Sequence, residues 1–391
     1  MSGPLHGVRV IEIAGLGAAP FGAMMLADMG ADVIRIDRLG GSDIMAWTEP
    51  RFDVMSRGRR SVALNLKREG AVEAVLTLIE TADVLLEAFR PGVMERLGLG
   101  PERCLACKPA LVYGRMTGWG QDGPLAQAAG HDINYVALSG VLHALGEPDR
   151  PPRTPMNLIG DFGGGGMLLA FGVVCALLAA RSSGKGQVVD AAMVDGSSLL
   201  ASMTWGLFAE RRWNLARGTN TNDCAAHYYG AYECADGKFV SIASAEPQFY
   251  ALLREKAGLQ DKAFDAQNDQ ALWPELKARM ATLFRTRTRE DWCALMEGTD
   301  VCFAPVLDWN EAPVHPHALA REAFVNVQGV PQPRPAPRFS GTPPPMPRAP
   351  VALGADTLAV LREAGFDEAR IALLQRSGAL AAATDAADGA R

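Results

Sequence analysis

Residues 8–37, VRVIEIAGLGAAPFGAMMLADMGADVIRID, contain the pattern that decides the fold. The β-branched run at 8–13 predicts a buried parallel strand, because such strands are apolar on both faces. The segment GLGAAP forms a turn, a helix follows and closes at Gly30, and residues 32–37 predict a second strand. A strand, a helix and a second strand in this order form a βαβ unit.

The same pattern repeats along the first half of the chain. Further strands are expected within 61–66, 83–89 and 110–120, with a helical segment at 69–82 between the first two. A last strand is expected to enter a helix within 186–204. Strands that alternate with helices predict a large doubly wound, Rossmann-like α/β domain.

A smaller α+β domain is expected to follow. The polar stretch 211–225 is a candidate crossing between domains, and residues 230–244 predict an antiparallel hairpin with ADG as its turn. We therefore predict four segments: the first part of the large domain at 1–200, a linker at 201–228, the small domain at 229–325, and a proline-rich strap followed by short amphipathic helices at 326–391.

Composition excludes several classes of partner. The chain has 391 residues and a net charge of −6, with a pI of about 5.6, so no basic field favours nucleic acid. The longest apolar run, residues 167–180, is shorter than the roughly 20 residues that a membrane-spanning helix needs, so it predicts a core helix. The N-terminus lacks the features of a signal peptide. These observations predict a cytoplasmic protein without a nucleic-acid or membrane partner.

Seven dispersed cysteines fit a reduced intracellular protein. Cys104 and Cys107 form a C-x-x-C pair, but no second Cys or His pair at zinc spacing accompanies it. The sequence therefore predicts no metal site.

The turn GLGAAP resembles the G-x-G-x-x-G of dinucleotide-binding domains, and Asp37 ends the second strand about 20 residues later. Pro20 occupies the third glycine position, however, where it is better explained as the first residue of a helix. Arg35 and Arg38 flank Asp37, and two cations suit a phosphorylated ribose, such as that of coenzyme A, better than the bare ribose of NAD. Nicotinamide chemistry is therefore disfavoured.

A basic cluster also favours a ligand rich in phosphate. Arg57, Arg59, Arg60 and Lys67 surround one predicted strand, and Arg90 ends the next. Cations at the carboxyl ends of parallel strands point to the usual ligand crevice of such sheets. A solvated surface run remains the alternative for the first three.

Three distant polar residues suggest one catalytic site. They are His131 in GHDINYVALSG (130–140), Asp161 in NLIGDFGGGG (157–166) and Glu246 in VSIASAEPQFYALL (240–253). Each alone could be a helix cap or a first-turn residue. Removing the weakly acidic α-proton of a thioester, however, needs a base, an enolate stabiliser and a dry pocket, and inversion also needs an acid on the opposite face. A His–Glu pair facing an Asp would supply both groups, and a glycine-rich strand-to-helix turn would let the backbone approach the thioester.

The sequence resembles the α-methylacyl-CoA racemases of the family III CoA transferase superfamily over about residues 3–350. The resemblance rests on GVRVIEIAGLGAAPFGAMMLADMGADVIRIDR, GRMTGWGQDGPLAQAAGHDINYVALSGVLHALG, NLIGDFGGGGM and YECADGKFVSIASAEPQFY, among other motifs. It implies that His131 pairs with Glu246 and that Asp161 works from the other face. It also implies that the Asp132 N–H binds the enolate oxygen and that Asn157 supports the site.

The resemblance further implies how coenzyme A, as part of an acyl-CoA substrate, would be held. Arg38 matches the position that meets the adenosine phosphates, and Lys67 and Arg90 match less exclusive positions along the same channel. No separate cofactor is implied. The expected assembly is an interlocked homodimer, in which the strap returns the chain to the large domain and Glu246 completes the partner's site.

Two other functions remain open. A CoA transferase of the same superfamily would use Asp161 as a nucleophile that forms an acyl anhydride, but such enzymes usually lack the equivalents of His131 and Glu246. An inactive CoA-binding protein is a third possibility, which the presence of all three groups disfavours. The acyl chain is not fixed by the sequence, although Met24, Met25, Met193 and Met203 could line an adaptable apolar pocket.

Overall fold

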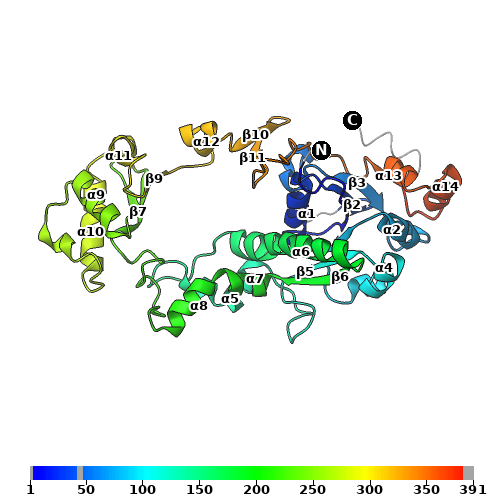
Figure 1. The fold of residues 1–391 in the computed structure, drawn as a ribbon, viewed down its shortest axis with the longest axis horizontal. Helices are drawn as coiled ribbons and strands as arrows, with labels where there is room; N and C mark the ends of the chain where they lie inside the picture. The colour runs from blue at the N-terminus through cyan, green and yellow to red at the C-terminus, as the bar shows by residue number, and fades with distance from the viewer. Residues whose placement is uncertain (1–2, 42–46, 382–391) are drawn as a thin grey trace. The chain divides into compact units, whose positions relative to one another are not determined.

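The computed structural model describes residues 3–41 and 47–381, and its contacts divide the chain into two compact units (Figure 1). The first unit comprises Met1–Val141, Pro155–Ala201 and Glu322–Arg391. The second comprises Leu142–Thr154 and Ser202–Arg321.

The limits of the units differ from the predicted segments. The stretch 201–228, expected as a linker, lies almost wholly in the second unit and contains the helix α8 (Ser202–Ala209). Residues 142–154 also join this unit, because the Arg217 guanidinium donates hydrogen bonds to three of their backbone carbonyls, at 2.7–2.8 Å. Such long-range pairing has no local signature in the sequence.

The first unit contains a parallel sheet of six strands in the order β3-β2-β1-β4-β5-β6, which is the doubly wound order of dinucleotide-binding folds. The strands are β1 (Arg9–Ile13), β2 (Asp32–Arg38), β3 (Arg60–Leu64), β4 (Val84–Glu87), β5 (Val112–Thr117) and β6 (Gln187–Ala192). The predicted large α/β domain is therefore confirmed.

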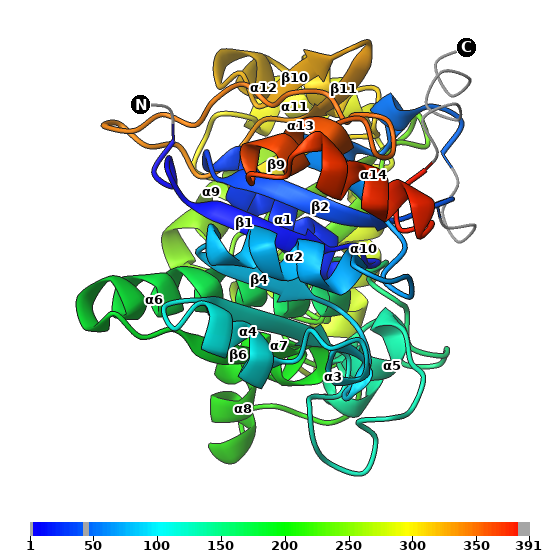
Figure 2. The ribbon, with the colours of Figure 1, turned by 90° about the vertical axis from the view of Figure 1, so that its right-hand side faces the viewer.

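Helices cover both faces of this sheet (Figures 1 and 2). One face packs against α1 (Ala18–Asp28) and α6 (Leu168–Ser183). The other packs against α2 (Ala71–Glu80), α4 (Pro101–Cys107), α13 (Thr357–Glu363) and α14 (Glu368–Arg376). The unit also contains α3 (Val93–Arg96), α5 (Asp132–Leu138), α7 (Met193–Leu200) and the short 3-10 helices Pro50–Phe52 and Val54–Ser56.

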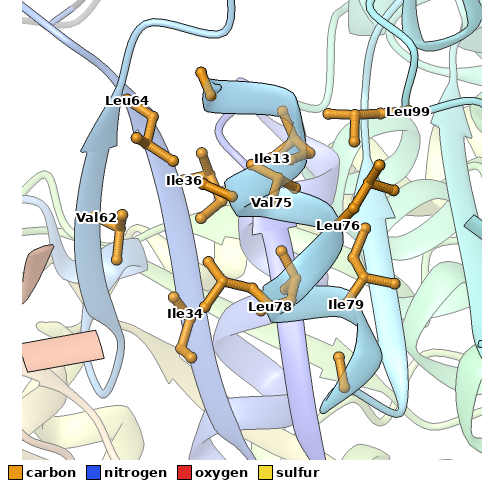
Figure 3. Close-up of a cluster of buried hydrophobic side chains, with 14 of the residues drawn as sticks. Ile13, Ile34, Ile36, Val62, Leu64, Val75, Leu76, Leu78, Ile79 and Leu99 are labelled. Atoms are coloured by element: carbon orange, nitrogen blue, oxygen red, sulfur yellow. The ribbon is translucent and has the colours of Figure 1, made fainter. Parts of the chain in front are cut away.

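Side-chain alternation along the strands explains why both faces are covered. Ile34 and Ile36 of β2 point toward α2, whereas Val33 belongs to the core on the opposite face. On α2, Val75 and Ile79 lie four residues apart and face the same strands, as Figure 3 shows. All five side chains are at most 2% exposed, so the sheet is apolar on both sides as the sequence predicted.

The glycine-rich segment is helical, so the predicted strand-to-helix turn is wrong. Leu158–Met167 forms a π-helical stretch, labelled η5, that continues directly into α6. The glycines allow close packing: a Cβ at Gly164 would lie 2.6 Å from the backbone nitrogen of Ser197, and one at Gly22 of α1 would lie 2.8 Å from the carbonyl oxygen of Gly166. Tertiary packing thus outweighs the low helix propensity of glycine.

The helix around the longest apolar run is also longer than predicted. In the described part of the chain, one helix, Leu158–Ser183, is long and apolar enough to cross a membrane by length and composition. In its most apolar 18-residue window, 44% is buried inside the structure. The core helix of a soluble protein also meets these criteria of length and composition. Leu169 and Val173 pack in the core of the first unit.

The proline-rich strap lies on the first unit. Its hairpin pairs β10 (Phe324–Val327) with β11 (Val330–Pro333). The Arg57 guanidinium donates to the Gln332 side chain at 2.9 Å and to the Pro333 carbonyl at 2.8 Å. Further along, the Asp356 carboxylate accepts the Ser61 N–H at 2.9 Å, so the C-terminal segment covers the free edge of β3.

The second unit contains the predicted hairpin, which is confirmed as β7 (Tyr229–Glu233) and β8 (Phe239–Ala243), and β9 (Phe303–Val306) pairs with β8. Its helices besides α8 are α9 (Pro247–Ala257), α10 (Trp273–Phe284), α11 (Arg289–Met296), α12 (Pro316–Ala320) and the 3-10 helices Lys262–Asp265 and Ala312–Val314. The 3-10 helix Val141–Ala144 begins at the last residue of the first unit's opening segment and continues into the second unit. Aromatic side chains dominate its core, which includes Tyr250, Phe284 and Trp292. All seven cysteines of the chain are free thiols.

Candidate active site

Asp161 lies in the first turn of η5, where neighbours from two elements hold it. Its backbone N–H donates to Oδ1 of Asp132, at 2.8 Å, and its Oδ2 lies 3.5 Å from the side-chain nitrogen of Asn157. Asp132 is the first residue of α5, and Asn157 is the N-cap of η5. Three of the predicted site residues therefore meet in the first unit.

The environment of the Asp161 carboxyl group favours its protonated form. Burial raises the pKa of Asp161, and the negative charge of Asp132 raises it further. The hydrogen bond from Asn157 and the charge of His131 act in the opposite direction. Asp132 is buried, and its Oδ2 has no hydrogen-bond partner among the described residues, so this charge acts on Asp161 with little screening. A carboxyl group with a raised pKa stays protonated to a higher pH than a free carboxyl group, so it can donate a proton as well as accept one.

The turn after β1 contributes a residue that the sequence reasoning missed. Gly17, in the GLGAAP turn, has a φ of 65°, a conformation that favours glycine. A Cβ there would lie 3.0 Å from Oδ2 of Asp161. The GLGAAP turn, which resembles a dinucleotide-binding motif, thus lies beside the Asp161 carboxylate. Pro20, at the third glycine position of that motif, is the third residue of α1 and not the first helical residue as predicted.

His131 precedes α5 in an extended conformation, and its imidazole is exposed. Its backbone N–H donates to Oδ1 of Asn134, at 3.0 Å. The segment before it is fastened by Tyr135, whose hydroxyl donates to the Gly130 carbonyl and whose ring packs edge-on against Trp119 at 4.7 Å. These contacts fix the backbone on both sides of His131.

Charges converge on this corner of the first unit. Burial raises the pKa of Tyr135, and the charges of Asp161, Arg90 and Asp132 also act on it. Arg90 follows β4, and the turn that presents it is held by Glu87, which accepts the Phe89 N–H at 2.7 Å. The structure therefore brings Arg90 toward the same region as His131 and Asp161.

Arg38 and Lys67 lie at the same edge of the sheet. Arg38 ends β2, Lys67 follows β3 by three residues, and Arg90 follows β4 by three residues. The carboxyl ends of neighbouring parallel strands meet at one edge, so these exposed cations share it. Within 3–41 and 47–381, no ion pair engages any of the three. They are available to an anionic ligand.

The other basic residues of the predicted cluster have structural partners instead. Arg57 makes a bidentate pair with Asp28. Arg59 pairs with the buried Glu12, and Arg60 with Asp32. Each pair neutralises a cation inside or beside the sheet, so for these three the predicted phosphate contact is wrong.

Asp37 and Arg35 are likewise engaged with each other. Nε of Arg35 lies 2.9 Å from Oδ1 of Asp37, and Asp37 also accepts the Ser61 hydroxyl at 2.5 Å. Asp37 is only 6% exposed. It is therefore closed to a ribose hydroxyl, which agrees with the argument against nicotinamide binding.

Glu246 lies in the second unit, at the turn from β8 to α9. It is the N-cap of α9, Pro247 follows as the first helical residue, and its side chain is exposed. Of the four methionines suggested for an acyl pocket, Met24, Met25 and Met193 pack in or against the core of the first unit, and Met203 on α8 is 62% exposed. Among the described residues, no group of three or more His, Cys, Asp or Glu side chains could hold a metal ion.

A half-buried carboxyl group within electrostatic reach of an imidazole, with cations along the carboxyl edge of a doubly wound sheet, defines an α/β enzyme of the acid–base type. The chain belongs to CoA-transferase family III, whose model matches residues 5–357. The resemblance drawn from the motifs is therefore confirmed.

Two curated relatives cover nearly the whole chain. It is 45% identical to an α-methylacyl-CoA racemase of Mus musculus over 369 residues, which are 94% of this chain and 95% of that protein. It is 42% identical over 373 residues, with the same coverage, to the Homo sapiens protein of that name. Among solved structures, a CaiB/BaiF family protein from Brucella suis matches with a TM-score of 0.82 and 27% identity, covering 93% of this chain and 100% of that one.

Proposed function

We propose that this protein is an α-methylacyl-CoA racemase, which interconverts (2R)- and (2S)-2-methylacyl-CoA thioesters by a 1,1-proton transfer through an enolate. The observation that carries the proposal is the meeting of Asp161, Asp132 and His131 at one corner of the first unit. The identity of 45% to a protein named as such a racemase supports it. Coenzyme A is part of the substrate, and neither a metal nor a redox cofactor takes part.

Asp161 and His131 serve opposite faces of C2. In one direction the Asp161 carboxylate removes the C2 proton, and protonated His131 delivers a proton to the other face. In the reverse direction the roles exchange, which suits a carboxyl group whose pKa is raised by burial. The Asp132 N–H belongs to the first turn of α5, where backbone donors have no partner inside the helix, and it stabilises the enolate oxygen. In the proposed homodimer, the partner's Glu246 orients His131 and stabilises its charged form.

The nucleotide part of coenzyme A lies along the carboxyl edge of the sheet. Arg38 binds its phosphates, and Lys67 and Arg90 follow along the channel toward the site. Their exposure and their lack of carboxylate partners among the described residues support this assignment.

A CoA transferase remains the second candidate, because the same family contains such enzymes and Asp161 could act as a nucleophile. The imidazole of His131, whose charge acts on Asp161, favours the racemase, since acyl transfer through an anhydride needs no second proton-transfer group.

The active form is a homodimer in this proposal. Large apolar side chains are exposed on helices of both units: Phe171 and Leu178 on α6 are 67% and 70% exposed, and Met203 on α8 is 62% exposed. Such surfaces indicate an interaction partner. Light scattering is expected to give twice the chain mass of 41.6 kDa at micromolar concentration. A monomer that racemises its substrate at full rate would exclude the dimeric site. The cytoplasmic location stays a prediction.

Deuterium exchange tests the reaction itself. One pure 2-methylacyl-CoA epimer, incubated with the enzyme in deuterated water, is expected to yield both epimers with deuterium at C2. A chelator and the absence of NAD should leave the rate unchanged. A parallel incubation contains a free carboxylic acid as acceptor. Transfer of CoA to that acid at a comparable rate, without exchange at C2, would assign the protein to the transferases instead.

Arg38→Ala is expected to weaken binding of CoA esters by roughly tenfold, the size of one charge-assisted contact, and to leave pantetheine esters unaffected. The reason is that pantetheine lacks the phosphates that Arg38 meets. Arg181→Ala is the matched control, because it removes the same charge at a different place. Arg181 lies in the last turn of α6, which leads to the amino end of β6 and so to the edge of the sheet opposite to the one where Arg38 lies. The measurement is KM for both ester types. Equal losses for both types would place Arg38 elsewhere.

A further inference from the structure

The turn that carries Glu246 is held by its backbone and not by its own side chain. Glu246 makes no side-chain capping bond to α9, so the direction of its carboxylate depends on residues 244–246. The Ser244 N–H donates to the Tyr228 carbonyl at 3.0 Å, and the Ala245 N–H donates to the Ala243 carbonyl at 2.9 Å. The backbone N–H groups of Ser244 and Ala245 therefore have hydrogen-bond partners in or beside the sheet. The carbonyls of the same two residues need donors from another part of the unit.

One side chain supplies those donors. The amide nitrogen of Gln267 donates to the Ser244 carbonyl at 3.2 Å and to the Ala245 carbonyl at 2.8 Å. Gln267 lies between the 3-10 helix Lys262–Asp265 and α10, and it is only 8% exposed. Two successive carbonyls just before Glu246 are thus fixed by a single buried amide group.

Gln267 is itself held in place. Its backbone carbonyl accepts the indole N–H of Trp273 at 2.9 Å, and Trp273 is 4% exposed in the core of the second unit. On the other side of the turn, the hydroxyl of the fully buried Ser244 donates to the Val301 carbonyl at 2.5 Å. The turn is therefore fastened from two directions to a rigid core, as expected where a functional side chain must be held within about 0.5 Å of its working position.

We propose that Gln267 is a positioning residue for Glu246. By holding the Ser244 and Ala245 carbonyls, it sets the direction in which the Glu246 carboxylate meets the imidazole of His131 of the partner subunit. This proposal rests on the proposed function, in which Glu246 orients the imidazole of His131 of the partner subunit and stabilises its protonated form. Gln267 touches no substrate and acts only through the turn.

Gln267→Met tests the proposal, because methionine has a similar length and no hydrogen-bond donor. It is expected to lower kcat about tenfold, as misplacement of a catalytic group does, and to change KM by less than about threefold. The loss is expected to be larger for the epimer whose exchange Glu246→Gln also slows. Gln267→Leu, which removes both amide donors without adding a charge, is the second variant should the first fold poorly.

Tyr232→Phe is the matched control for a loss of stability. It also removes one buried donor to a backbone carbonyl in the same core, since the Tyr232 hydroxyl donates to the His227 carbonyl at 2.6 Å. Its thermal midpoint should fall, but kcat should not change for either epimer. If Tyr232→Phe loses as much activity as Gln267→Met at an equal loss of stability, Gln267 has only a structural role.

A double-mutant cycle separates the positioning role from the proposed function. In the Glu246→Gln background, Gln267→Met is expected to cost less than about twofold, because the group it positions is already gone. An equal loss in both backgrounds would overturn the positioning role and leave the proposed function intact. Full activity in Glu246→Gln alone would instead contradict the role of Glu246 in the proposed function, and the inference about Gln267 would fail with it.

Discussion

Asp161→Ala is expected to lower the rate of racemisation by at least about 10²–10⁴-fold, the range typical of a general acid–base group. One face of C2 then has no proton donor or acceptor, so inversion stops in both directions. Exchange should not stop completely, because the His131 side is intact and can still remove and return the proton of one epimer. The expected result is an enzyme that exchanges one epimer without racemising it.

The pH dependence provides a second readout of Asp161. Burial and the charge of Asp132 raise the pKa of this carboxyl group. As the pH is lowered, the wild-type rate of the step in which Asp161 acts as a base should therefore begin to fall while the pH is still above the usual carboxyl range. That limb should be absent from the residual exchange of Asp161→Ala. Proton NMR of the C2 signal, recorded for each pure epimer between acidic and neutral pH, measures both effects.

Asp190→Ala is the control for the loss of a carboxylate in the same unit. Asp190 lies on β6, and burial raises its pKa also, but its carboxylate accepts the Gln121 N–H and does not contact Asp161. It should keep wild-type exchange of both epimers. A covalent acyl adduct on Asp161 of the wild-type enzyme, trapped with hydroxylamine, would contradict the acid–base role and indicate a transferase.

The strands of the large domain could be predicted because their signal is local. Each carries a short run of β-branched or other apolar residues, and the structure places all six where the sequence indicated a strand. Alternation with helices was enough to predict a doubly wound domain, since right-handed crossovers leave few alternatives. The hairpin of the second unit was equally local, with its turn at Asp236–Gly237.

Features that depend on tertiary partners could not be predicted in this way. The glycines at 163–166 read as a turn, yet close approach to α1 and α7 makes them helical. Arg57 and Arg59 read as candidate phosphate ligands, but their carboxylate partners Asp28 and Glu12 lie 29 and 47 residues away in the sequence. An ion pair of that separation leaves no local pattern.

The candidate site shows the same division. His131, Asp161 and Glu246 were selected by chemistry and by resemblance, and the structure adds how the first two are held. The bond from the Asp161 N–H to the Asp132 carboxylate joins residues 29 apart, and the contact of Gly17 with Asp161 joins residues from opposite ends of the first half of the chain. The one available signal for Gly17 was a glycine where the dinucleotide motif also has one, and that motif pointed to the wrong ligand.

His131→Ala is expected to show the reverse of the Asp161→Ala phenotype. Racemisation should again fall by at least about 10²–10⁴-fold, but the surviving exchange should belong to the other epimer, because only Asp161 remains to move a proton. His6→Ala, which removes an exposed imidazole from the same unit, should have no effect. The assay is the same C2 exchange measurement on each pure epimer, so that the two catalytic variants are compared directly.

Glu246→Gln completes this prediction, since Glu246 is proposed to act only through His131. A carboxylate partner orients the imidazole and stabilises its positive charge. Its loss should therefore reduce turnover less than the loss of His131 itself. The epimer that His131→Ala cannot exchange should be the one that Glu246→Gln exchanges slowly. If His131→Ala and Asp161→Ala abolish exchange of both epimers equally, or if neither abolishes any, the assignment of one base to each face is wrong. If Glu246→Gln instead impairs the epimer served by Asp161, Glu246 acts on the opposite face and is not the partner of His131.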